Sequence, residues 1–124
     1  MDFRVSVHPG TAFVLVVCSG NARWREVLEA IDAIGESAVR EGASRAVLDV
    51  LAVDLQASTE EHAAIGQRLA VALGELERVA FVVDQGQRVG VGEDAARQGG
   101  LNLKTFVRLP EAIDWVTASG EQTA

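Results

Sequence analysis

The chain has 124 residues, a length that fits one domain, and 48% of them are hydrophobic, which is enough for one ordinary core. The formal net charge of −7 argues against nucleic acid and anionic membranes as partners, because their phosphate groups attract basic proteins. A single cysteine, Cys18, excludes an intrachain disulfide and a cysteine-rich zinc site. No apolar run is long enough to cross a bilayer and the N-terminus does not resemble a signal peptide, so we expect a cytoplasmic protein without a membrane span.

Two strands joined by a turn are predicted at the start of the chain. Phe3–Val7 alternates apolar and polar residues, which indicates a half-buried strand. Ala12–Val17 is a continuous apolar run, typical of a strand that is covered on both faces. Because His8–Thr11 contains proline and glycine, we expect a turn there and a hairpin overall.

Helices and strands alternate in the rest of the chain. Apolar residues recur every three or four positions over Trp24–Arg40, which predicts a helix, and Ser19–Asn21 is expected to cap it. The later predicted elements are a strand at Arg45–Val50, a loop at Leu51–Ala57, a helix after Ser58, a strand at Val79–Val83, a helix at Arg88–Gln98, a strand at Leu103–Val107 and a helix at Glu111–Ala118.

The predicted order is β-β-α-β-α-β-α-β-α. Strands that alternate with helices imply right-handed crossovers, so we expect an α/β fold with a mostly parallel five-stranded sheet and packed helices. One domain at 1–118 is predicted, followed by a flexible C-terminal tail at 119–124, because those last residues are polar.

Asp49 and Asp54 flank the end of the predicted strand Arg45–Val50, and Asp84 follows the next predicted strand. In parallel sheets, ligands gather at the carboxyl ends of the strands, so one interpretation is a magnesium site or a phosphoacceptor aspartate. The alternative is a set of loop carboxylates that cap turns. The first parallel strand ends in Cys18-Ser19-Gly20 without an acid, and we therefore predict no metal and no cofactor.

Two further patterns have a functional and a structural interpretation. Gly90–Ala95 matches the G-x-G-x-x-A dinucleotide pattern, but six residues separate it from the strand before it, and a glycine-rich helix start explains it equally. His62 lies three and four residues after Thr59 and Ser58, a spacing compatible with a general base. No third group is placed to orient the imidazole, so we expect a protein that is not an enzyme.

Ser58 is also predicted to begin the second helix. Ser58-Thr59-Glu60-Glu61 is a capping box, in which a hydroxyl accepts from a free backbone N–H and Glu61 reaches back. The order of elements, Val47–Val50 before a short connection, and Ser58-Thr59 at a helix start resemble the STAS family of anti-sigma-factor antagonist-like domains. The similarity extends over nearly the whole chain and is closest to the stand-alone, sporulation-antagonist-like branch.

The resemblance implies a protein-interaction function with a phosphorylation switch. In such antagonists an Asp-Ser-Ser/Thr-Gly motif begins the second helix, and a partner kinase that is also the anti-sigma factor phosphorylates its second hydroxyl residue. Here Ala57 stands in place of the Asp and Glu60 in place of the Gly, while Ser58 and Thr59 match the hydroxyl positions. The candidate phosphorylation residues are thus Ser58 and Thr59, and the candidate partner-binding residues are Asp54, Ser58, Thr59, Glu60 and His62.

An alternative function is implied by a similarity of this branch to lipid-carrying CRAL-TRIO domains. It implies an apolar pocket between the sheet and the helices, which would hold a small apolar or amphiphilic ligand. The residues that could line it are Leu51, Val53, Leu55, Ile65 and Leu69, and filling of the core is the competing interpretation. The expected partner is a protein, with a homodimer also plausible because two-fold dimers are the commonest oligomers.

Overall fold

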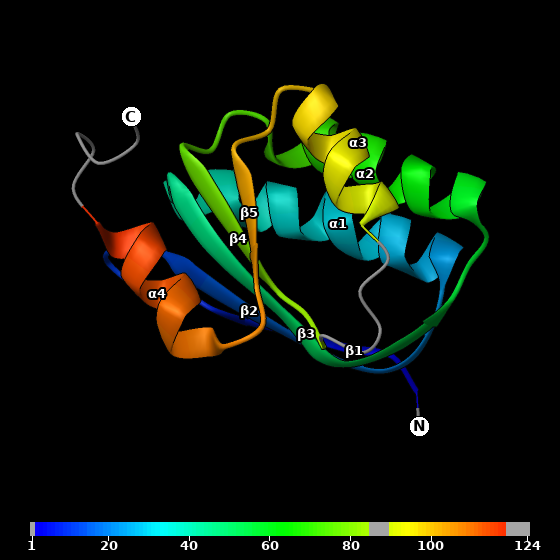
Figure 1. Cartoon of the computed structure of the whole chain (residues 1–124). Helices are drawn as coiled ribbons and strands as arrows, with labels where there is room; N and C mark the ends of the chain where they lie inside the picture. The colour runs from blue at the N-terminus through cyan, green and yellow to red at the C-terminus, as the bar shows by residue number, and fades with distance from the viewer. Residues whose placement is uncertain (1, 85–89, 119–124) are drawn as a thin grey trace.

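The computed structural model describes residues 2–84 and 90–118. In chain order these residues form β1 (Arg4–His8), β2 (Val14–Arg23), α1 (Trp24–Arg40), β3 (Arg45–Gln56), α2 (Thr59–Leu73), β4 (Arg78–Val82), α3 (Val91–Gln98), β5 (Leu103–Phe106) and α4 (Leu109–Thr117). The predicted order of elements is confirmed. Figure 1 shows their arrangement in space.

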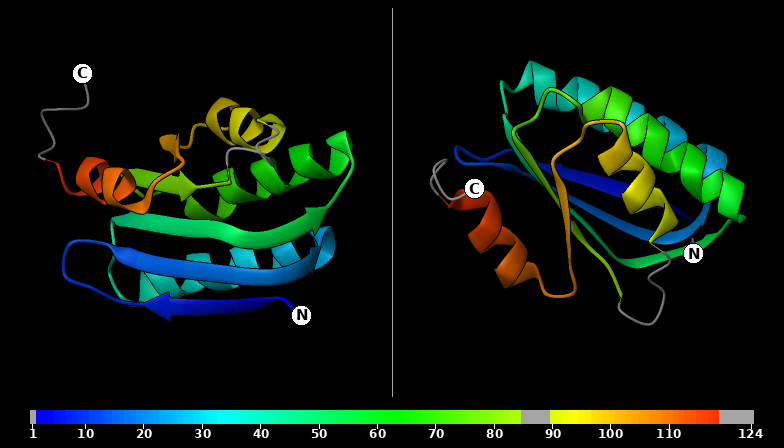
Figure 2. Two further views of the ribbon diagram at one scale, coloured as in Figure 1. Left: turned by 60° about the horizontal axis from the view of Figure 1, so that its bottom comes forward. Right: turned by 45° about the horizontal axis from the view of Figure 1, so that its top comes forward.

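The five strands form one sheet in the spatial order β1-β2-β3-β4-β5. β1 is antiparallel to β2, and the other neighbours are parallel. Because the parallel strands advance in one direction across the sheet, right-handed crossovers place α1, α2 and α3 on the same face. α4 follows the last strand and covers the opposite face, as both views in Figure 2 show.

β2 and β3 are much longer than the sequence patterns predict. Ser19–Asn21, predicted as a helix cap, belongs to β2, and Leu51–Gln56, predicted as a loop, belongs to β3. These two segments pair with each other in parallel, which satisfies their backbone groups. Gly20 has φ of +100°, and a Cβ there would lie 2.1 Å from the Asp2 carbonyl oxygen. This glycine therefore allows the backbone at Asp2 to lie close against β2, and it does not form a turn.

An extra residue in β3 interrupts its pairing with β2. Val17 pairs with Asp49 and Ser19 pairs with Ala52, so β3 has two residues where β2 has one. A bulge of this kind moves every later side chain to the opposite face of the sheet. The β3 residues that face α1–α3 are therefore even-numbered before the bulge and odd-numbered after it.

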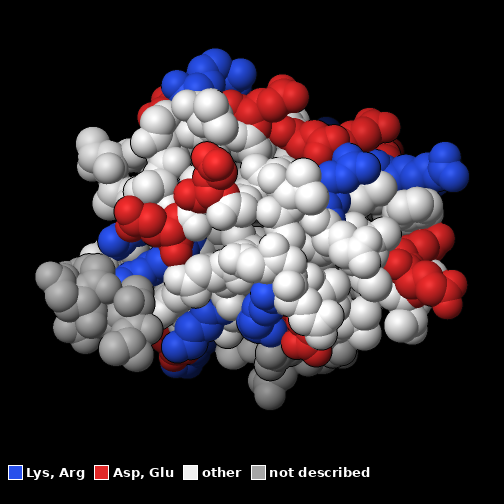
Figure 3. Space-filling view, turned by 90° about the horizontal axis from the view of Figure 1, so that it is seen from above, with Lys and Arg blue, Asp and Glu red and all other residues white. Residues whose placement is uncertain are grey.

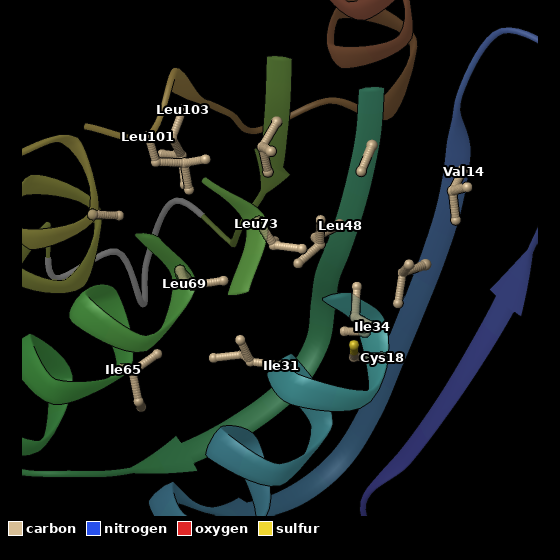
Figure 4. Close-up of a cluster of buried hydrophobic side chains, with 14 residues drawn as sticks. Val14, Cys18, Ile31, Ile34, Leu48, Ile65, Leu69, Leu73, Leu101 and Leu103 are labelled. Atoms are coloured by element: carbon tan, nitrogen blue, oxygen red, sulfur yellow. The ribbon is translucent and has the colours of Figure 1, made fainter. Parts of the chain in front are cut away.

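Two hydrophobic clusters hold the layers together, one on each face of the sheet. The larger cluster packs β2, β3 and β4 against α1, α2 and α3, and Figure 4 shows its side chains. The smaller cluster packs the other face against α4 through Val47, Ala80, Val82, Ala112 and Val116. Both faces of the central strands are thus buried, as their continuous apolar sequences predict.

Two arginines attach the end of α4 to the sheet. Arg78 is 2% exposed and its Nη1 donates to the carbonyl oxygens of Trp115 at 2.6 Å and Ala118 at 3.0 Å. Arg45 Nη1 donates to the carbonyl oxygens of Val116 and Ala118, both at 2.8 Å. The last carbonyls of a helix have no partner within the helix and carry partial negative charge, so two guanidinium groups stabilise this end.

Other differences from the predicted bounds are small. α4 begins at Leu109 and not at Glu111, with proline in its first turn. α3 begins at Val91, and the predicted start at Arg88 lies outside the described residues, as do residues 85–87 after β4 and the predicted tail at 119–124. Within the described residues, no helix combines the length and the apolar character needed to span a bilayer.

Candidate functional site

A cavity of about 470 Å³ lies between the sheet and helices α1, α2 and α3. The sheet contributes Cys18, Leu48, Val50, Val53, Leu55 and Phe81 to its apolar wall. α1 and α2 contribute Val27, Ala30, Ile31, Ile34, Ile65 and Leu69. Six of these side chains, from β2, β3, α1 and α2, are labelled in Figure 4. Protein interiors hold few voids larger than a water molecule, and ligand pockets measure about 300–1,000 Å³, so this cavity has the size of a ligand site.

The position of the cavity agrees with the apolar pocket that the sequence resemblance implies. Val53, Leu55, Ile65 and Leu69 line it, as expected. Leu51 does not line the cavity. It is one of the two β3 residues in the bulge, and its side chain is 39% exposed. The same four lining residues belong to the larger hydrophobic cluster, so core packing and the cavity wall share them.

The polar part of the cavity wall lies at the carboxyl end of the parallel strands. Asp54 and Gln56 come from the end of β3, His62 from the first turns of α2, and Asp84 from the segment after β4. Asp84 lines the cavity and is exposed to solvent, so it marks the mouth. Asp54 and Gln56 border the cavity, but they alternate with Val53 and Leu55 along β3, so their exposed side chains project from the opposite face of the strand. Asp54 Oδ1 accepts a hydrogen bond from Gln56 Nε2 at 3.2 Å.

Glu93, in the first turn of α3, brings a carboxylate to the same wall and is only 7% exposed. It has an interaction partner, as does Asp84. Within the described residues, the cavity wall contains no lysine or arginine.

Cys18 lies on β2 at the apolar side of the cavity, beside Ile34 in Figure 4. Its side chain is 5% exposed. Burial, and secondarily the negative charge of Asp49, raises the pKa of the thiol from 9.0 to about 11. The thiolate is the reactive form of cysteine, so this residue is a small hydrophobic group at neutral pH and not a nucleophile.

The first residues of α2 form an exposed polar surface beside the cavity mouth. Ser58 caps the helix as predicted: its Oγ accepts from the Glu61 backbone N–H at 3.1 Å, and Glu61 Oε1 accepts from the Ser58 N–H at 2.9 Å. Ser58, Thr59 and Glu60 are exposed. The Ser58 hydroxyl is thus engaged in the capping box, whereas no hydrogen bond from Thr59 Oγ1 to another described residue is present.

The other sequence patterns have structural explanations. Asp49 and Asp54 both lie within β3, which extends beyond the predicted strand end, and Asp49 Oδ1 accepts from the Leu51 N–H at 3.1 Å. Among the described residues, no three His, Cys, Asp or Glu side chains are arranged to hold a metal ion. His62, for which a solvated position was the alternative to catalysis, is half-buried in the cavity wall.

The G-x-G-x-x-A match is explained by the packing of α3. Gly90 has φ of +89° and precedes the helix as its N-cap. A Cβ on Gly92 would lie 3.1 Å from the His62 carbonyl oxygen, and a Cβ on Gly66 would lie 2.1 Å from the Gly92 carbonyl oxygen. These glycines allow α2 and α3 to approach closely. The close packing explains the glycine pattern without a bound nucleotide.

Sequence reasoning missed Gln56, Glu93 and Cys18 as cavity residues. Val53–Gln56 alternates apolar and polar side chains, and this period of two was the available signal for the extension of β3. It was hidden because the bulge shifts the alternation relative to the first half of the strand.

Comparisons with known proteins support the fold. No family model matches the sequence, and no curated protein matches it. An anti-sigma factor antagonist from Mycobacterium paratuberculosis has a similar structure, with a TM-score of 0.63, 17% sequence identity, and 94% of this chain and 96% of that chain covered.

Two further solved structures have the same architecture. An uncharacterised protein of the DUF3478 family with a SpoIIAA-like fold, from Shewanella loihica, has a TM-score of 0.55 and 19% identity, with 92% and 93% of the two chains covered. The anti-sigma factor antagonist SpoIIAA in its unphosphorylated form has a TM-score of 0.56 and 12% identity, with 91% and 96% covered. At these identities the likeness concerns the fold, and the chain therefore has the STAS-like fold that the sequence predicts.

Proposed function

We propose that the chain is a non-enzymatic regulatory module that binds a protein partner at the start of α2. The docking surface consists of Asp54, Ser58, Thr59 and Glu60, with His62 behind them. The observation that carries this proposal is the exposure of these hydroxyl and carboxylate groups at one end of a fold shared with anti-sigma factor antagonists. A partner suited to this surface presents basic side chains or hydrogen-bonding groups.

Phosphorylation of Thr59 would switch this interaction off. Ser58 Oγ is engaged in the capping box, so its modification would disturb the helix start as well. The Thr59 side chain is exposed and next to Glu60 and Glu61. A phosphate adds about −1.5 to −2 charges at pH 7, which would repel a partner fitted to the unmodified surface.

The test uses the histidine-kinase-like proteins encoded in the same genome as this chain. Each is incubated with the purified protein and ATP, and complex formation is followed by gel filtration and phosphate transfer by intact mass. We expect one kinase to bind the unmodified protein and to release it after adding a single phosphate.

The Thr59→Val variant should bind that kinase and stay unmodified. Thr11→Val is the matched control, because Thr11 is an exposed threonine in the turn before β2, at the opposite end of the strands. Failure of every such kinase to bind or modify the protein would refute the switch, as would equal phosphate transfer to the Thr59→Val variant.

A second candidate function is the binding of a small apolar or amphiphilic molecule in the cavity. The specific observation in its favour is the volume of about 470 Å³ with an apolar wall and a polar, exposed mouth. Organic extraction and native mass spectrometry of the purified protein test it, with the expectation of one bound amphiphile per chain.

The Ala30→Phe variant, which fills the cavity from α1, should lose this bound molecule. Ala33→Phe places the same side chain on the exposed face of α1 and should retain it. A protein that carries nothing, and takes up no added amphiphile, would refute this second function.

A further inference from the structure

We infer that His62 anchors the ligand of the cavity, and that this ligand is a single-chain apolar molecule with a hydroxyl head that hydrogen-bonds to the imidazole. This inference rests on the second candidate function above, the binding of a small molecule in the cavity. It adds the residue that holds the ligand, the chemical class of the head and the orientation of the chain.

His62 lies on the face of α2 that is turned toward the sheet. The buried residues of this helix are Ile65, Gly66, Leu69 and Leu73, which follow His62 by three, four, seven and eleven positions. Residues at these spacings share one face of a helix. The His62 side chain therefore belongs to the buried stripe of α2, which agrees with its half-buried position in the cavity wall.

A polar side chain on this inner stripe is an exception. On the helical face seen in Figure 3, acidic and basic side chains are both present, as is usual for a surface in contact with water. Glu60 and Gln67 lie on the side of α2 opposite the stripe and are exposed. The other buried members of the stripe are apolar, so His62 is the position at which α2 brings a hydrogen-bonding group to the cavity.

The imidazole of His62 has no protein partner in the described part of the chain. Its backbone N–H donates to the Ser58 carbonyl oxygen at 2.9 Å, whereas no hydrogen bond or ion pair from its ring to another described residue is present. A neutral imidazole carries one donor and one acceptor nitrogen, and polar groups that are withdrawn from water normally form hydrogen bonds. A ligand head beside His62 supplies that hydrogen bond.

The other polar side chains at the cavity are less available to a ligand. Asp54 and Gln56 project from the opposite face of β3, and Asp84 and Glu93 already have interaction partners. Of these five polar residues in the described wall, His62 is the one that both faces the cavity and has a ring without a partner.

The direction of α2 sets the orientation of the ligand. Helical side chains lean toward the N-terminus of their helix, so the His62 ring leans toward the start of α2, at the carboxyl end of the parallel strands. Ile65 and Leu69 follow on the same stripe and are 7% and 1% exposed. The head therefore lies beside His62 and the apolar chain runs inward past Ile65 and Leu69.

The imidazole and the volume define the class of ligand. A hydroxyl group can both donate to and accept from a ring nitrogen, and it loses less than a charged head does on leaving water. A water molecule occupies about 30 Å³ in the liquid, so a cavity of about 470 Å³ has room for on the order of fifteen groups of that size. An alcohol of about eight to ten carbons fits this space, whereas a two-chain phospholipid does not.

The test compares 1-octanol with 1-chlorooctane, which has the same chain and a head that donates no hydrogen bond. Affinities are measured by NMR titration, and the stoichiometry by native mass spectrometry. The sequence contains two histidines, so their ring nitrogens can be followed individually in long-range ¹H–¹⁵N spectra. We expect one octanol per chain and a shift of the His62 ring signals, with the His8 signals unchanged.

Matched variants separate the hydrogen bond from the general affinity for apolar chains. His62→Phe keeps a flat ring and removes the hydrogen bond, so it should weaken octanol about two- to tenfold relative to chlorooctane. His62→Gln retains a donor and an acceptor and should recover part of this ratio. His8→Phe makes the same change at an exposed residue at the end of β1 and should leave the ratio as in the wild type.

The outcomes distinguish the anchor from the cavity itself. If both probes bind but the ratio of their affinities is the same in the wild type and in His62→Phe, the hydrogen bond to His62 is refuted and the ligand-binding function stands. An equal change in His8→Phe would also refute the anchor. If neither probe binds, or if Ala30→Phe binds them as well as the wild type does, the ligand-binding function is refuted together with this inference.

Discussion

Cys18 gives the sharpest quantitative prediction, because its burial links protein stability to pH. Its thiol is 5% exposed, and burial with the nearby charge of Asp49 raises its pKa from 9.0 to about 11. The folded state therefore favours the protonated thiol. The stabilisation is fully present below pH 9, the ordinary pKa, and is lost as the pH rises toward 11.

The expected size of the effect follows from the two pKa values. One pKa unit corresponds to about 1.36 kcal/mol, and between pH 8 and pH 10.5 most of the two-unit difference is expressed. The free energy of unfolding should fall by about 2 kcal/mol over this range because of Cys18 alone. The same shift makes the thiolate about a hundredfold rarer at pH 7 than in an ordinary cysteine, so alkylation should be at least that much slower than in the unfolded chain.

Urea unfolding followed by tryptophan fluorescence measures this dependence. The sequence contains no tyrosine and one lysine, so few other side chains titrate in this range. Cys18→Ala is less stable at pH 8, because it leaves a void, but it should lose about 2 kcal/mol less than the wild type by pH 10.5. Identical slopes for the two proteins would show that the thiol titrates normally and that its environment is not the one described.

Four substitutions test the helix cap and the packing of the helices. Ser58→Ala should lower the free energy of unfolding by about 1 kcal/mol through loss of the capping hydroxyl, whereas Thr59→Ala should change it by less than about 0.5 kcal/mol; equal effects in urea titrations would contradict the assigned roles. Gly66→Ala should cost on the order of 1–3 kcal/mol, since its methyl group would meet the Gly92 carbonyl oxygen and displace α3, and an unchanged melting temperature would disprove this close contact. Arg78→Met should cost about 2–4 kcal/mol and accelerate amide hydrogen exchange in α4, because the Trp115 carbonyl loses its arginine donor and the Ala118 carbonyl keeps only Arg45; slow exchange in the variant would argue against this attachment.

The order of the elements and the fold class could be predicted from the sequence alone. The apolar stripe of α1 and the capping box at Ser58 are local signals, in which residues three or four positions apart determine the structure. The continuous apolar runs of the central strands report burial on both faces, which requires helices on each side. Ser58, Thr59 and Glu60 were singled out by the capping box and the family resemblance, and in the structure they are exposed.

The cavity was decided by contacts between distant parts of the chain. The extensions of β2 and β3 exist because each satisfies the backbone hydrogen bonds of the other, and neither segment is a conspicuous strand by itself. The bulge in β3 then turns Val53 and Leu55 toward the helices, a change of face that only the pairing register with β2 determines.

The positions of the acidic residues in space were likewise decided by contacts between distant parts of the chain. From the sequence, the net charge of −7 was a property of the whole chain that argued against nucleic acid and membranes. The tertiary structure brings Asp84 and Glu93 to the wall of one apolar cavity and Asp54 to its border, because the carboxyl ends of β3 and β4 and the start of α3 lie at the same edge of the sheet. Local sequence thus determined which residues are charged, and long-range strand pairing decided which of them share a site.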